Sequence, residues 1–142
     1  MIYLDSSSLL KLLFDEPESE AVREKVALER KVIISSHAEL ESRVQLKAAW
    51  LGGHYNERRY QKFLTTIGLL HESDPFRFAK LTEAVFEIAI RQDFEAETLH
   101  LRPLDRLHLA AMEELGIRCL MTNDTAQSIA AKALGFEVVM PK

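Results

Sequence analysis

The chain has 142 residues, of which 47% are hydrophobic, and this suits a single domain with a buried core. A formal net charge of −4 argues against a strongly basic nucleic-acid binder, and no apolar stretch approaches the ~20 residues that a membrane span requires. The opening residues lack the basic and apolar regions of a signal peptide, and the single cysteine, Cys119, excludes an internal disulfide. We therefore expect a cytoplasmic protein.

Short apolar strands alternate with helices along the chain. From the N-terminus the pattern predicts a strand at 1–5, helices at 6–14 and 20–30, a strand at 32–35, helices at 36–51, 56–70, 76–92 and 103–115, a strand at 117–121, a helix at 124–134 and a strand at 136–140. Because the strands are uniformly apolar, they indicate a mostly parallel sheet covered by helices on both faces. No proline-, glycine- or serine-rich linker divides the chain, so residues 1–142 form one helix-rich α/β domain.

Two predicted strands end on an aspartate. Asp5 closes the first strand, and Asp124 follows the strand at 117–121 after Thr122 and Asn123. In a parallel sheet both turns lie at the same edge, where α/β proteins bind their ligands, so the two carboxylates should converge. Each also has a purely structural explanation, since an aspartate before a helix serves as its N-cap. Asp124 and Gln127 have the spacing of a capping box.

A third carboxylate is expected from the helix at 36–51, where Glu39 and Glu41 compete. Glu39 lies four residues before Arg43 and is explained by an exposed ion pair along the helix. Glu41 fits a helical stripe that we expect to be buried, formed by Ala38, Glu41, Val44, Ala48 and Leu51. A carboxylate on an inward face needs a cation or a proton, so Glu41 is the preferred candidate and Glu39 the alternative.

A fourth carboxylate, Asp105, falls in the first turn of the helix at 103–115. The helix dipole alone would favour an acid at this position. Asp105 lies in line with His108, which is explained more simply as a hydrogen-bonded core residue than as a ligand or base.

The four acids together carry more weight than any one of them. Two unit charges about 4 Å apart repel by roughly 4 kcal/mol at an effective dielectric constant of 20, so four ionised carboxylates can share a pocket only around a cation. Oxygen ligands without histidine or cysteine select Mg²⁺ or Mn²⁺. Such a site activates water for attack on a phosphodiester.

The chain resembles the PIN domain family, and within it the VapC-type ribonuclease toxins of toxin–antitoxin pairs. The resemblance covers essentially the whole length and rests on "YLDSSSLLKLL", "LRPLDRLHLAAM" and "LMTNDTAQSIAAKALGFEVV" in the family's order and spacing. The family's acids fall on Asp5, Glu41, Asp105 and Asp124, and its hydroxyl residue after the first aspartate falls on Ser6. The resemblance implies that these acids hold one or two Mg²⁺ or Mn²⁺ ions and cleave RNA.

Ser6, Asn123 and Arg106 are expected beside the metal ligands or against the substrate; Arg106 stands where the family more often has a small residue. The resemblance also implies a homodimer and inhibition by a cognate antitoxin protein. The basic segment "NERRYQKF" is open to three interpretations: an RNA surface, an antitoxin groove or a dimer face. The alternative function is a PIN-like binding module that engages RNA or a protein without turnover.

Overall fold

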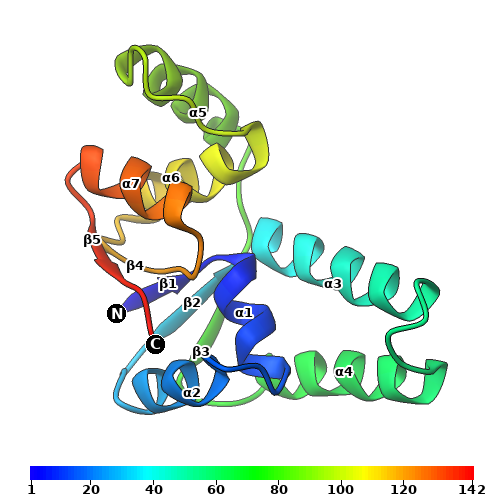
Figure 1. Ribbon diagram of the computed structural model, residues 1–142. Helices are drawn as coiled ribbons and strands as arrows, with labels where there is room; N and C mark the ends of the chain where they lie inside the picture. The colour runs from blue at the N-terminus through cyan, green and yellow to red at the C-terminus, as the bar shows by residue number, and fades with distance from the viewer.

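The computed structural model describes all residues from 1 to 142 (Figure 1). In chain order the elements are β1 (Ile2–Leu4), α1 (Ser6–Leu13), α2 (Ser19–Ala27), β2 (Val32–Ser35), α3 (Ser36–Leu51), α4 (Glu57–Leu70), β3 (Phe76–Ala79), α5 (Ala84–Glu95), α6 (Pro103–Leu115), β4 (Cys119–Met121), α7 (Thr125–Ala133) and β5 (Glu137–Val139). Pro103 begins α6, and Gly116 ends it in the left-handed conformation at φ 70°. No helix is both long and apolar enough to cross a membrane.

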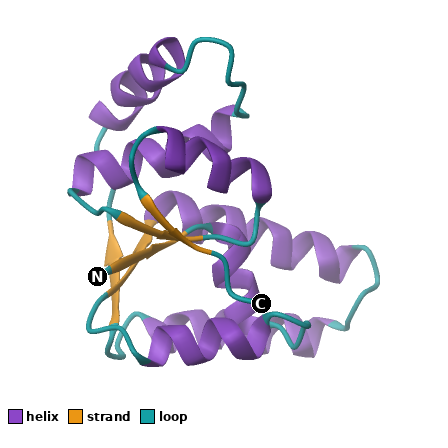
Figure 2. Ribbon diagram, turned by 60° about the vertical axis from the view of Figure 1, so that its left-hand side comes forward, coloured by secondary structure: helices purple, strands orange, loops and turns teal.

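The five strands form one sheet in the order β3-β2-β1-β4-β5, and every neighbouring pair is parallel (Figure 2). β1 lies at the centre, with Tyr3 in register with Ile33 of β2 and with Leu120 of β4. Because all strands run the same way, their carboxyl ends meet at one edge of the sheet. The α/β class and the parallel sheet predicted from the sequence are confirmed.

Alternate residues of the central strands enter different cores on the two faces of the sheet. Tyr3, Ile33 and Leu120 pack with residues of α5, α6 and α7 on one face. Ile2, Leu4 and their neighbours in β2 and β4 pack with residues of α1 and α2 on the other. Helices therefore cover both faces, which explains why the strands read as continuous apolar runs rather than as alternating ones.

Helices α3 and α4 form a hairpin that extends to one side of the sheet (Figure 1). A smaller core joins Leu46 of α3 to Phe63 and Ile67 of α4. The buried stripe predicted for α3 was wrong in most of its members, because Val44 and Leu51 are 58% and 68% exposed. The helix is turned so that a different stripe is buried, and this stripe consists of Ala38, Ser42 and Leu46.

The helix predicted for residues 76–92 was wrong in its first part. Phe76–Ala79 forms the edge strand β3, paired with β2 over four residue pairs, and α5 begins only at Ala84. Phe76 is buried in the core beneath α1 and α2, and Phe78 stacks on the ring of His71 at 3.5 Å. The pairing with β2 and the packing of these two aromatic residues therefore favour a strand over a helix in this segment.

Candidate active site

Asp5 leaves β1 at the carboxyl edge of the sheet and caps α1. Its Oδ1 accepts hydrogen bonds from the Ser8 backbone N–H at 3.1 Å and the Ser7 hydroxyl at 2.6 Å, and its Oδ2 accepts one from the Thr122 hydroxyl at 2.5 Å. Only 3% of Asp5 is exposed. Burial raises the pKa of this carboxyl group, although the charge of His108 and these hydrogen bonds act in the opposite direction.

Asp124 leaves the neighbouring strand β4 and caps α7, as the sequence predicted. Its Oδ1 accepts a hydrogen bond from the Gln127 backbone N–H at 2.9 Å. The turn is tied to Asp5 through Thr122, whose hydroxyl oxygen accepts from the Asp124 N–H at 3.0 Å and whose hydroxyl donates to Asp5. The two strand-end aspartates thus lie at one edge of the sheet, joined through a single threonine.

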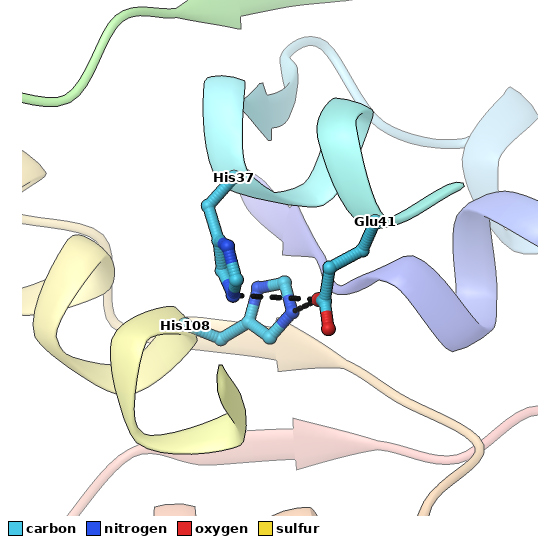
Figure 3. A group of neighbouring side chains, drawn as sticks. All are labelled: His37, Glu41 and His108. Carbon is cyan, nitrogen blue, oxygen red and sulfur yellow. Dashed lines mark hydrogen bonds and ion pairs between the residues drawn. The ribbon is translucent and has the colours of Figure 1, made fainter. Parts of the chain in front are cut away.

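Glu41 enters the same region from α3 and meets two imidazoles (Figure 3). Its Oε1 lies 2.5 Å from His108 Nε2, 3.3 Å from His37 Nε2 and 3.1 Å from the Ser6 hydroxyl that donates to it. Burial alone would raise the pKa of Glu41, but the hydrogen bond and charge of His108, together with His37 and Ser6, outweigh it and lower the pKa. Burial and the neighbouring His108 lower the pKa of His37.

Asp105 approaches from the first turn of α6 and is held by Arg102. Arg102 Nε donates to Asp105 Oδ2 at 2.8 Å, and Arg102 Nη2 lies 3.8 Å from Asp124 Oδ2. The Gln127 side-chain amide donates to the Asp105 carbonyl at 3.0 Å, so Gln127 joins α7 to α6 and does not return to its own cap as a capping box would require. The Arg102 guanidinium therefore links two of the four acids.

Three of the four acids are connected by one intervening residue: Asp5 and Asp124 by Thr122, and Asp105 and Asp124 by Arg102. Ser6, next to Asp5 in the chain, bonds Glu41. The acids nevertheless do not form one tight cluster. The only three metal-ligating side chains with ligand atoms all within 4.8 Å of one another are His37, Glu41 and His108.

The three residues expected beside the acids differ in position. Ser6 bonds Glu41, as described. The Asn123 amide accepts from the Ser8 hydroxyl at 3.1 Å and donates to the Pro141 carbonyl at 3.2 Å, so both of its ends hold the turn after β4. Arg106, expected beside the metal ligands or against the substrate, is only 3% exposed and lines a cavity of about 480 Å³ with Asp93 of α5.

Sequence reasoning missed His37 and Arg102 and assigned His108 to the core. His37 stands four residues before Glu41, a spacing that places both on one helix face, so the signal was present. Arg102 stands three residues before Asp105, which is also a helical spacing. His108 is buried and hydrogen-bonded as predicted, but no pattern within one helix indicates that its partner is Glu41 of another.

The donor set suits a hard divalent cation. Carboxylate oxygens of Asp5, Glu41, Asp105 and Asp124, with the Ser6 hydroxyl nearby, are the oxygen ligands that Mg²⁺ and Mn²⁺ prefer. The exposed Arg102 guanidinium, at hydrogen-bonding distance from Asp105 and 3.8 Å from Asp124, shows that positive charge is accommodated between these acids. The residues present therefore fit a divalent metal ion, which these four acids would hold.

Comparison with known proteins agrees with this geometry. The PIN domain family matches residues 2–133. Ribonuclease VapC46 of Mycobacterium tuberculosis is 30% identical over 142 residues, which cover 99% of this chain and 97% of that protein.

Three solved structures show the same fold at lower identity. VapC20 of Mycobacterium tuberculosis, a toxin that cleaves the sarcin–ricin loop, has a TM-score of 0.74 at 20% identity and covers 99% of this chain and 100% of its own. FitAcB from Neisseria gonorrhoeae has a TM-score of 0.70 at 23% identity, with 99% and 98% covered. FitAB bound to an IR36 DNA fragment has a TM-score of 0.72 at 19% identity, with 98% and 94% covered. The chain belongs to the PIN domain family and, within it, to the VapC group.

Proposed function

We propose that this protein is a metal-dependent endoribonuclease that hydrolyses RNA phosphodiester bonds as the toxin of a toxin–antitoxin pair. The observation that carries the proposal is the meeting of Asp5 and Asp124 at adjacent parallel strand ends, with Glu41 and Asp105 supplied by flanking helices. A chain of the VapC group with this set of acids has the groups that metal-assisted phosphodiester hydrolysis requires.

The four acids would hold Mg²⁺ or Mn²⁺, directly or through water. When bound, the ion activates water and stabilises the charge that develops on the phosphate. Ser6 then orients Glu41 by its hydrogen bond, and Asn123 holds the turn that carries Asp124. Arg102, 72% exposed and adjacent to two of the acids, is better placed than Arg106 to meet a phosphate.

A binding module without turnover is the second candidate, and one observation favours it. Both carboxylate oxygens of Asp5 are already engaged by hydrogen bonds, and the residue is almost fully buried. If these bonds do not yield to a metal ion, the protein retains the acids but not the catalytic site.

Cleavage of a mixed RNA pool by the purified protein separates the two candidates. We expect cleavage with Mn²⁺ or Mg²⁺ and none in a chelator. Glu41→Gln should lose at least ~100-fold in rate, a loss of roughly 3 kcal/mol of transition-state stabilisation. Glu39→Gln is the matched control, because Glu39 lies two residues away and pairs with Arg43 and His71. Cleavage that does not depend on metal, or no cleavage under any condition, would contradict the proposed metal-dependent nuclease activity.

The proposed partners are an RNA substrate, a cognate antitoxin protein and a second copy of the chain. Exposed apolar side chains on α5, with Ile90 72% and Phe94 84% accessible, support a protein-binding surface.

Expression of the chain alone should arrest growth, whereas co-expression with the product of an adjacent gene should restore it. Harmless accumulation of active protein would count against the toxin role and leave the nuclease untouched.

A further inference from the structure

The carboxylate of Glu41 is bound asymmetrically. All three contacts, from His108, His37 and Ser6, reach Oε1, and no side chain or backbone group of the protein bonds Oε2. Figure 3 shows both imidazoles on one side of the carboxylate, with both dashed lines ending on the same oxygen. The protein therefore holds Oε1 of the Glu41 side chain and makes no hydrogen bond to Oε2.

The strongest of these contacts is itself anchored in the core. His108 Nδ1 lies 2.7 Å from the Tyr3 hydroxyl, and that hydroxyl lies 2.6 Å from Ser35 Oγ. Ser35 caps α3 by accepting from the Ala38 N–H at 3.1 Å. The bonds thus form a closed path that leaves α3 at its N-cap, crosses β1 and α6, and returns to α3 at Glu41.

Every member of this path inside the core is inaccessible to solvent: Tyr3 and Ser35 are 0% exposed and His108 is 1% exposed. Burial raises the pKa of Tyr3 far above its ordinary range, so its hydroxyl keeps its proton. An ionised Glu41 can only accept, so His108 Nε2 carries the hydrogen of the 2.5 Å bond. Apolar residues of similar size would fill the same space without polar groups that must all be paired. The path ends on a carboxylate at the candidate metal site, and this location is the reason to assign it a function.

We propose that His108 and Tyr3 are positioning residues that hold Glu41 Oε1 through the Tyr3–His108 bond and so present Oε2 to the divalent metal. This inference rests on the proposed function and deepens it. Without the imidazole, the long Glu41 side chain would be free to adopt other rotamers, and each metal-binding event would have to order it again.

The test is Mn²⁺ affinity measured by calorimetry on the purified protein and on five variants, one of which is the Glu41→Gln variant described above. We expect His108→Leu to weaken Mn²⁺ binding 10–100-fold, the range typical for loss of a group that orients a metal ligand. Tyr3→Phe, which removes only the hydroxyl, should weaken it by less. His108→Gln, whose amide N–H can replace the imidazole Nε2–H, should recover most of the affinity. His100→Gln, at an exposed histidine that makes no contact with Glu41, is the matched control.

Kinetics supply the second measurement. His108→Leu should lower kcat with little change in KM for RNA, and His108→Gln should restore kcat. Failure of the wild-type protein to bind Mn²⁺ and to cleave RNA would overturn the proposed function together with this inference. If the wild type binds and cleaves, but Tyr3→Phe and His108→Leu bind Mn²⁺ as tightly, the inference alone is overturned. If His108→Leu does not fold, Tyr3→Phe and His108→Gln decide. The inference is overturned if Tyr3→Phe binds Mn²⁺ as tightly as the wild type. It is also overturned if His108→Gln binds Mn²⁺ no more tightly than Glu41→Gln.

Discussion

At the scale of single residues, the strand-end aspartates that we propose as metal ligands are also helix caps. Asp5 and Asp124 each cap a helix through one oxygen, Oδ1, and the caps hold both carboxylates at the carboxyl edge of the sheet. The two residues differ in environment, since Asp5 is buried and Asp124 is one-third exposed at its side chain. A helix cap is therefore compatible with the proposed catalytic role, because the capping bond fixes the position of the carboxylate.

Asp5→Asn should separate the two roles. Asparagine caps a helix about as well as aspartate, and its amide can donate to the Thr122 oxygen in place of Oδ2. Because burial raises the folded-state pKa of Asp5, its ionisation destabilises the fold as pH rises through that pKa, and the neutral variant removes this effect. Without metal, the variant should unfold at pH 8 at the same temperature as the wild type or at a higher one. RNA cleavage should fall at least ~100-fold.

Asp124→Asn tests the same idea at the more accessible cap and serves as the comparison. Its metal-free stability should stay near wild type, because Gln127 keeps its N-cap partner. Its RNA cleavage should fall in the same way. Thermal unfolding in chelator and cleavage with Mn²⁺ are the two measurements, and wild-type cleavage by either variant would reduce that aspartate to a helix cap.

Arg102→Gln should tighten metal binding. The Arg102 guanidinium contacts Asp105 and approaches Asp124, so a divalent cation entering between these acids must displace it or share their charge. Exposed ion pairs of this kind are weak, so we expect the Mn²⁺ dissociation constant to fall about two- to five-fold, with little change in metal-free unfolding temperature. Arg43→Gln, which breaks the similar pair with Glu39, is the control and should leave metal binding unchanged. Weaker Mn²⁺ binding by the Arg102 variant would show that Arg102 supports the site instead.

At the scale of elements, the orientation of α3 determines where Glu41 points. Mutations can test which residues of α3 are buried. Leu46 is 0% exposed in the small core with α4, whereas Val44, two residues away, is 58% exposed. Leu46→Ala should lower the free energy of unfolding by about 2–5 kcal/mol, and Val44→Ala should change it by less than about 0.5 kcal/mol. Chemical denaturation measures both. Equal losses of unfolding free energy in the two variants would support the buried stripe that was predicted from the sequence, which includes Val44.

Most elements could be predicted from local patterns, because caps, glycine stops and apolar strands are local features. Helices 36–51 and 103–115 were predicted with the bounds that α3 and α6 have. The strand β3 was not, because four residues are too few to show alternation and the segment continues into a helical pattern. Its identity comes from pairing with β2, a partner more than 40 residues away in the chain.

The same distinction applies to the site. Asp5, Glu41, Asp105 and Asp124 could be proposed as a set, because parallel strand order brings distant turns to one edge. The contacts between elements could not: His108 meets Glu41 across 67 residues, and Thr122 meets Asp5 across 117. The stripe on α3 was wrong for the same reason, since the turn of a helix about its axis is set by the helices that pack on it.

At the scale of the whole molecule, the charge distribution bears on the proposed binding of metal and RNA. The chain carries a net charge of −4, so the proposed RNA binding would have to rely on local basic surfaces. One such surface is the start of α4, where Arg58, Arg59 and Lys62 line a shallow cavity with Asp15. A bound metal ion would lower the negative potential around the acids.

Mg²⁺ and Mn²⁺ should consequently stabilise the entire fold. An ion that binds the native but not the unfolded chain at 100 times its dissociation constant adds about 2.7 kcal/mol. For a domain of this size that corresponds to a rise in Tm of roughly 5–10 °C. The acids come from the turns after β1 and β4 and from α3 and α6, so a bound ion would join elements that are far apart in sequence, and its effect should appear in a single cooperative transition. The Asp5→Asn/Asp124→Asn double variant should lose the metal-dependent rise while keeping its metal-free transition. An unchanged melting temperature of the wild-type protein at millimolar Mg²⁺ and Mn²⁺ would mean that the acids hold no ion in the isolated chain.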